Sequence, residues 1–127
     1  MGKPKVVVIE DDPAVQFMYR FKLEHEGFDV RTADNGKTGL EVIKDFKPAV
    51  ILLDLLMPVM SGTDMLRKLR ETSWGSDVRV IILTNISKDE APQELRFLHV
   101  DRYVVKAHTT PAEVVKIVQE VLGQKIK

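Results

Sequence analysis

Two kinds of hydrophobic pattern alternate along the chain. Residues 5–9, 49–53 and 79–83 are almost continuously apolar and rich in β-branched side chains, and a shorter run, residues 104–105, follows Tyr103. Such runs are typical of parallel strands that are buried on both faces of a sheet. Phe28, Val30 and Thr32 instead alternate with polar residues, which predicts a strand nearer the edge of that sheet.

The segments between these runs carry helix signals. Ser61 with Asp64, and Thr110 with Glu113, have the spacing of capping boxes. Gly27 and Pro48 predict the ends of the first two helices, the second covering roughly residues 37–46. The helix after Thr110 has one apolar face, formed by Val114, Val115, Val118, Val121 and Leu122.

The alternation of strands and helices predicts an α/β fold. We expect one doubly wound (βα)5 domain over residues 1–127, with a five-stranded parallel sheet and helices on both faces. The fourth helix is the least specified. Ser87 and Glu90 form a possible capping box, but Pro92 would then lie too far inside the helix, so a start near Pro92 is the alternative.

Composition narrows the function classes. The 127 residues include 19 basic and 19 acidic side chains, so no net positive charge favours direct binding to nucleic acid. The absence of cysteine excludes disulfides, thiolate catalysis and cysteine-ligated metals. No apolar run approaches the ~20 residues of a membrane span, and no signal-peptide pattern is present. We therefore expect a cytoplasmic protein that binds neither nucleic acid nor membrane directly.

Polar residues follow four of the predicted strands. They are Glu10, Asp11, Asp12, Asp54, Thr84 and Lys106. Ligands of open α/β sheets bind beyond the carboxyl ends of the strands, so we expect these side chains to form one site. Clustered carboxylates repel one another, and a divalent cation such as Mg²⁺, which prefers oxygen ligands, would compensate. Lys106 and Thr84 could then bind an anionic group on Asp54, which indicates a carboxylate that accepts a phosphoryl group.

Asp12 has an alternative interpretation. Because Pro13 follows it, Asp12 is better explained as the N-cap of the first helix than as a metal ligand.

Taken together, these motifs resemble the receiver domains of two-component response regulators. The resemblance rests on Glu10-Asp11-Asp12-Pro13 after the first strand, residues 54–62 (DLLMPVMSG) after the third, Thr84, Tyr103 and Lys106, and it extends over essentially the whole chain. It implies a flavodoxin-like receiver fold and a signalling domain that catalyses only its own phosphorylation and slow dephosphorylation.

The resemblance also implies a Mg²⁺ site and a phosphoacceptor. Asp54 would accept the phosphoryl group from a phosphohistidine of a sensor kinase or phosphotransfer protein. The metal ligands would be Asp11, Asp54, Glu10 through a water molecule, and the backbone carbonyl of Leu56.

The same resemblance implies a conformational switch. Thr84 would bond the phosphoryl oxygens and Lys106 would pair with them, while Tyr103 would turn inward behind Thr84. These movements would shift the face formed by the fourth helix, the fifth strand and the fifth helix, and so signal to a downstream protein target.

The first helix has more apolar surface than docking on a sheet requires. Ala14, Phe17, Met18 and Phe21 form one group, and Val15, Tyr19 and Leu23 another. Together they cover about two-thirds of the circumference, against the ~100° stripe of an ordinary surface helix. The resemblance implies that the surplus apolar surface of this helix is a kinase-docking surface, which we assign to the first group. The alternative is a wide helix partly covered by the last helix.

Three positions depart from the family pattern. Ala107 stands where a proline in a cis peptide usually follows the lysine, and we expect a trans peptide here. Asn85 is larger than the usual residue after the threonine, which suggests that it narrows access to Asp54 or bonds a phosphoryl oxygen. His99-Val100 replaces a turn that usually contains glycine.

Two other function classes share features with this chain. A phosphatase of the aspartyl-phosphate type would need a second acid two residues beyond Asp54, where Leu56 stands. A degenerate receiver that acts only as an interaction module is the remaining alternative, although Asp11, Asp54, Thr84 and Lys106 are all present. The sequence leaves open whether the chain acts alone or belongs to a longer protein.

Overall fold

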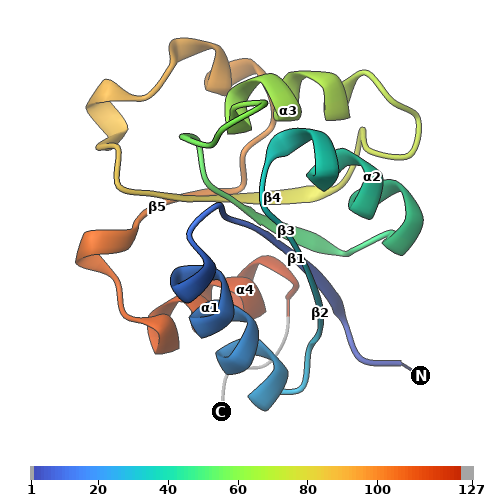
Figure 1. Ribbon diagram of the computed structural model, residues 1–127, viewed down its shortest axis with the longest axis vertical. Coiled ribbons are helices and arrows are strands. Elements are labelled where there is room, and N and C mark those ends of the chain that lie inside the picture. The colour runs from blue at the N-terminus through green and yellow to red at the C-terminus, as the bar shows by residue number, and fades with distance from the viewer. Residues whose placement is uncertain (1, 124–127) are drawn as a thin grey trace.

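A five-stranded parallel sheet forms the centre of the computed structural model, which describes residues 2–123 (Figure 1). Its strands are β1 (Lys5–Ile9), β2 (Asp29–Ala33), β3 (Val50–Leu53), β4 (Arg79–Thr84) and β5 (Arg102–Val105), in the spatial order β2-β1-β3-β4-β5. All five predicted strands are confirmed, and β2 lies at one edge as its alternating pattern indicated. Residue 1 and residues 124–127 of the predicted domain lie outside the described residues.

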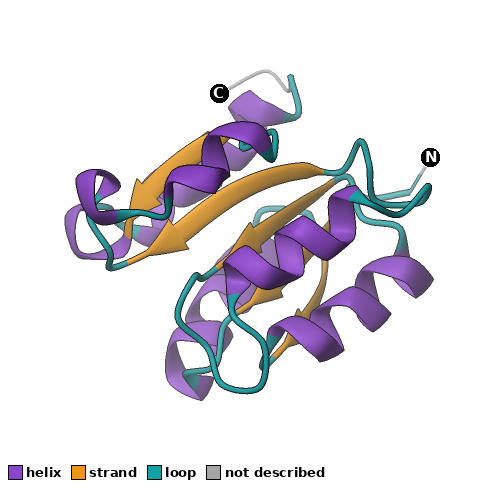
Figure 2. Ribbon diagram, turned by 90° about the horizontal axis from the view of Figure 1, so that it is seen from above, coloured by secondary structure: helices purple, strands orange, loops and turns teal. Residues whose placement is uncertain are grey.

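Four α-helices cover the two faces of the sheet. Helices α1 (Pro13–His25) and α4 (Pro111–Val121) lie below it in Figure 1, and α2 (Gly36–Phe46) and α3 (Gly62–Arg70) lie above it. The layered arrangement is visible in Figure 2. Consecutive residues of a strand point to opposite faces of the sheet. Val6 and Val8 therefore pack in the core between the sheet and helices α1 and α4, whereas Val7 and Ile9 pack in the core on the side of α2 and α3. No helix within residues 2–123 is both long and apolar enough to cross a bilayer.

The predicted helix starts are confirmed by their hydrogen bonds. The Asp12 carboxylate accepts from the backbone N–H groups of Ala14 and Val15, which makes Asp12 the N-cap of α1. Thr110 and Glu113 form a complete capping box at the start of α4. These bonds satisfy amide groups that a helix cannot pair internally.

The prediction of a fourth α-helix after β4 was wrong. Two short 3₁₀ helices, η1 (Lys88–Glu90) and η2 (Gln93–Phe97), occupy that connection. Each begins at one of the two alternative starts, since Ser87 precedes η1 and Pro92 precedes η2. Pro92 has no N–H to continue a helix, and the Ser87 hydroxyl bonds the Glu90 carboxylate rather than a backbone amide. The proposed signalling face, expected from a fourth helix, the fifth strand and a fifth helix, is therefore formed by η1, η2, β5 and α4.

One arginine fastens this irregular connection to the rest of the fold. The guanidinium of Arg70, at the end of α3, donates to the carbonyls of Leu98 and His99 at 2.8 and 2.7 Å. It also donates to the carbonyls of Gly75, Ser76 and Val78 in the loop before β4. His99 has a φ of 55°, the left-handed conformation that a glycine would adopt most easily.

Candidate functional site

The register of the sheet brings the strand-terminal polar residues together. Ile9 lies opposite Leu53, and the N–H of Asp54 donates to the carbonyl of Ile9 at 3.1 Å. Glu10 and Asp54 therefore follow neighbouring strands at the same height. On the other side of β3, Thr84 ends β4 opposite Val105, which places Lys106 one residue beyond the end of β5.

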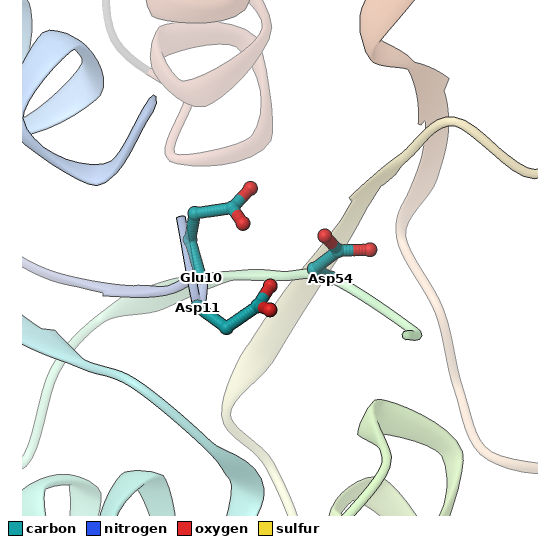
Figure 3. A group of neighbouring side chains, drawn as sticks. All are labelled: Glu10, Asp11 and Asp54. Atoms are coloured by element: carbon teal, nitrogen blue, oxygen red, sulfur yellow. The ribbon is translucent and has the colours of Figure 1, made fainter. Parts of the chain in front are cut away.

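Three carboxylates converge at this edge (Figure 3). Glu10 and Asp11 extend from the end of β1, and Asp54 faces them from the end of β3. One oxygen from each lies within 4.8 Å of the others. Only 4% of Glu10 and 7% of Asp54 is exposed, whereas Asp11 is exposed. Because charges so close and so poorly solvated repel, the group needs positive charge.

Lys106 supplies one positive charge. Its Nζ lies 2.5 Å from Glu10 Oε1 and 2.9 Å from Asp54 Oδ2. Burial by itself lowers the pKa of Lys106, but the hydrogen bonds to both carboxylates raise that pKa above its usual value. Burial raises the pKa of Glu10, and the bonds from Lys106 and from the Asp12 N–H oppose that increase. Lys106 is therefore a charged bridge between the two buried acids.

The remaining charge is unbalanced. Asp12 is used as the cap of α1, so the sequence-based estimate of four converging carboxylates becomes three, against the single ammonium of Lys106. The converging donors are all carboxylate oxygens, which suit a hard cation. Glu10, Asp11 and Asp54 could therefore hold a metal ion.

The backbone around Asp54 is closely packed. A Cβ added to Gly62, the first residue of α3, would lie 2.1 Å from the carbonyl oxygen of Asp54. The Gly62 N–H donates to the carbonyl of Leu55, and the Leu56 N–H donates to Asp54 Oδ1 at 3.4 Å. Only a glycine lets α3 begin this close to the end of β3.

Sequence reasoning missed Gln16, which organises the other side of the cluster. Its Nε2 donates to the backbone carbonyl of Glu10 at 2.8 Å, to that of Ala33 at 3.2 Å and to the carboxylate of Asp34 at 3.0 Å. The bonds join α1 to the ends of β1 and β2. The one signal in the sequence that could have indicated this role was a polar residue on the sheet-facing side of the first turns of an amphipathic helix.

Comparison with known proteins identifies the family. The model of the response regulator receiver domain matches residues 6–119. The chain belongs to this family. It is thus a receiver domain of the kind found in two-component systems, and the resemblance stated from its motifs is confirmed.

Relatives of this receiver occur both within longer proteins and in chains of similar length. It is 34% identical to the phosphate regulon transcriptional regulatory protein PhoB of Rhizobium meliloti over 110 residues, which cover 85% of this chain but 48% of PhoB. It is 30% identical to an uncharacterized 14.6 kDa protein of Leptolyngbya boryana, covering 94% of this chain and 91% of that protein. The chain thus spans about half of the transcriptional regulator and nearly all of the small protein.

Solved structures support the same fold. The chemotaxis protein CheY4 of Vibrio cholerae superposes with a TM-score of 0.87 at 27% identity, covering 94% of this chain and 99% of CheY4. The flavodoxin-like α/β receiver fold is therefore confirmed.

The two predicted switch residues, Thr84 and Tyr103, lie on the neighbouring strands β4 and β5. Thr84 is buried at the end of β4. Tyr103 is half-buried, and its hydroxyl donates to the carbonyl of Ile86 at 2.7 Å, two residues after Thr84. Burial and the nearby charges of Asp54 and Glu90 raise the pKa of Tyr103. Their roles in switching stay predictions.

Two of the three positions that depart from the family pattern, Asn85 and Ala107, contact each other. No cis peptide occurs within residues 2–123, so the expected trans bond before Ala107 is confirmed. Asn85 was expected to narrow access to Asp54 or to bond a phosphoryl oxygen. Its Oδ1 accepts the N–H of Ala107 at 3.1 Å.

The structure separates the two apolar groups of α1. Tyr19 and Leu23 are buried in the core that α1 shares with α4. On the outer side, 67% of Phe17 and 60% of Phe21 is exposed, and Ala14 and Met18 are exposed too. The rings of Phe17 and Phe21 stack with their centroids 6.1 Å apart. The helix thus has a covered apolar face and an exposed one.

Proposed function

We propose that this receiver takes a phosphoryl group from a phosphohistidine of a partner histidine kinase or phosphotransfer protein onto Asp54. A carboxylate oxygen of Asp54 forms the new O–P bond, and the N–P bond to the donor imidazole breaks, leaving its electron pair on that nitrogen. Water later hydrolyses the acyl phosphate and releases inorganic phosphate. The observation that carries the proposal is the convergence of Glu10, Asp11 and Asp54 around the buried ammonium of Lys106.

Lys106 and Thr84 act on the transferred group. The Lys106 ammonium already touches Asp54 Oδ2, so it is placed to pair with phosphoryl oxygens added to that carboxylate. Thr84 ends the adjacent strand, β4, and its hydroxyl donates a hydrogen bond to the same oxygens. Both groups oppose the negative charge of a phosphoryl group at a largely buried carboxylate.

The acidic cluster holds Mg²⁺ in this proposal. Asp11 and Asp54 would bind it directly, Glu10 would bind through water, and the backbone carbonyl of Leu56 would complete the protein ligands. When bound, Mg²⁺ supplies positive charge that offsets the phosphoryl charge during transfer. The excess of carboxylates over ammonium groups supports this assignment.

The exposed apolar face of α1 is the kinase-docking surface. It consists of Ala14, Phe17, Met18 and Phe21, and it starts one turn after the acidic residues at the end of β1. A large exposed aromatic pair on a helix is unusual for a face without a partner. An apolar helix of the histidine-bearing protein would cover it and bring the phosphohistidine to Asp54.

The proposed signal leaves the site through Thr84 and Tyr103. Because the Tyr103 hydroxyl holds the carbonyl of Ile86, a movement of Thr84 toward the phosphoryl group pulls on the loop that Tyr103 anchors. That loop leads directly into η1 and η2. The face formed by η1, η2, β5 and α4 would thus change its packing and contact a downstream protein.

Intact mass measurement tests the phosphoacceptor. The purified chain is incubated with Mg²⁺ and acetyl phosphate or phosphoramidate, and we expect one added phosphoryl group, lost in Asp54→Asn. Asp12→Asn is the matched control, because asparagine caps a helix as well as aspartate does and the same charge is removed two positions from Glu10. An unmodified wild-type chain, beside a control regulator that reacts, would favour a receiver that acts only as an interaction module.

The metal and docking roles have separate tests. Chelation should stop the reaction, and Asp11→Asn should raise the Mg²⁺ concentration that gives half the maximal rate.

For docking, the double variant Phe17→Ser, Phe21→Ser should slow transfer from the most reactive member of a panel of autophosphorylated histidine kinases. Its rate with acetyl phosphate should not change, because that donor needs no helix contact. Equal slowing with both donors would count against a docking role.

A further inference from the structure

The ends of β4 and β5 are tied by one side chain. Asn85 directly follows Thr84, and Ala107 directly follows Lys106. Since Thr84 and Val105 lie opposite each other in the sheet, the two loops leave it side by side. The Asn85 Oδ1 bridges them by accepting the Ala107 N–H at 3.1 Å. A backbone N–H can only donate, so this contact also fixes which end of the Asn85 amide faces Ala107.

This bond holds a backbone that has few other restraints. Residues 106–108 form the single 3₁₀ turn η3 (Lys106–His108). Thr109 bonds the carbonyls of Val105 and Lys106, but those contacts stay within residues 105–109 of the same segment. The hydrogen bond that the Ala107 N–H donates to the Asn85 side chain joins the η3 backbone to the residue that follows β4. A first-turn amide such as that of Ala107 otherwise has no partner inside its helix.

Ala107, whose backbone this bond restrains, directly follows Lys106. Lys106 must direct a long, flexible side chain between Glu10 Oε1 and Asp54 Oδ2. Holding the backbone at Ala107 limits the positions of the Lys106 Cα, and so reduces the conformational freedom that the side chain loses when it reaches both carboxylates.

We propose that Asn85 is a positioning residue for Lys106, acting through the Ala107 N–H, an inference that rests on the proposed phosphoryl transfer to Asp54. Asn85 acts here on the loop of the lysine and does not gate access to Asp54. The two interpretations make opposite predictions. Loss of a gate would speed the reaction, whereas loss of a positioning bond would slow it.

Three substitutions at position 85 test the proposal. Asn85→Ala and Asn85→Leu remove the acceptor, the second with little change in size, while Asn85→Asp keeps an acceptor oxygen. With acetyl phosphate and saturating Mg²⁺, Ala and Leu should lower the maximal phosphorylation rate about threefold to tenfold, the range expected for one hydrogen bond. The donor concentration at half-maximal rate should stay unchanged. Asn85→Asp should recover the rate to within about twofold of the wild type.

Amide hydrogen exchange at Ala107 follows the bond itself. The wild type and Asn85→Asp should protect this amide, and Asn85→Ala and Asn85→Leu should not. A rate that is unchanged or increased when protection is lost would overturn the positioning role, as would an unprotected Ala107 amide in the wild type. A wild-type chain that takes no phosphoryl group at all defeats the proposed function instead, so the two failures are distinguishable.

Discussion

The Lys106 ammonium lies 2.9 Å from Asp54 Oδ2 and at the same time contacts the carboxylate of Glu10, with both acids almost fully buried. Removing the ammonium leaves two poorly solvated carboxylates facing Asp11 without compensation. Lys106→Met should therefore reduce the free energy of unfolding at neutral pH by about 2 kcal/mol, measured by urea denaturation.

Mg²⁺ should recover part of this loss if the cluster holds a cation. The increase in unfolding free energy on adding Mg²⁺ should be larger in Lys106→Met than in the wild type. Lys116→Met, on the exposed side of α4, is the matched control and should show neither effect. Equal stability of Lys106→Met and wild type without metal would mean that the lysine does not offset the charge of the acids.

Gly62 allows α3 to begin against the backbone of Asp54. An added methyl group would overlap the Asp54 carbonyl oxygen, so Gly62→Ala should lower the free energy of unfolding by about 1–3 kcal/mol and displace Asp54. Urea denaturation and the rate with acetyl phosphate measure the two effects. Gly2→Ala is the control, because nothing lies within 4 Å of the added methyl group. A Gly62→Ala chain with wild-type stability would contradict this close approach.

The connection between β4 and β5 has little regular secondary structure, and hydrogen bonds from Arg70 hold it against the rest of the fold. Its half-buried guanidinium donates to five backbone carbonyls, so Arg70→Ala should cost about 3 kcal/mol of unfolding free energy. Arg70→Lys should recover only part, because an ammonium cannot reach all these acceptors. Arg67→Ala, on the same helix but paired at the surface with Asp64 and Glu94, should have a much smaller effect. Similar losses for both arginines would refute the fastening role.

Val59 is strained in the loop between Asp54 and α3. Its φ of 68° is unfavourable for a β-branched residue, and 78% of it is exposed, so little packing depends on its side chain. Val59→Gly should raise the free energy of unfolding by about 0.5–1 kcal/mol. Val59→Ala, which keeps a Cβ, should gain much less. Thermal unfolding of the three chains distinguishes these outcomes, and a destabilised glycine variant would show that the side chain makes a contact that matters.

Local patterns were sufficient where neighbouring residues decide the structure. The caps at Asp12, Ser61 and Thr110 were predicted because each depends on residues within three positions. The helix after β4 was mispredicted because the two competing starts, at Ser87 and at Pro92, each yield only a short 3₁₀ helix. A contact between residues far apart in the sequence, from Arg70 to Leu98 and His99, holds that segment in place.

The sequence by itself determined the order of the five strands and of α1 to α4, the acidic and basic residues at the strand ends and the receiver family, because these follow from periodicity and short motifs. Only the tertiary structure decided which side of α1 is covered, because that depends on α4 packing against Tyr19 and Leu23. It also decided that Lys106 bridges Glu10 and Asp54, and that Asn85 binds Ala107. Those contacts join residues from separate strands, and their distances depend on sheet register and packing, which no local pattern encodes.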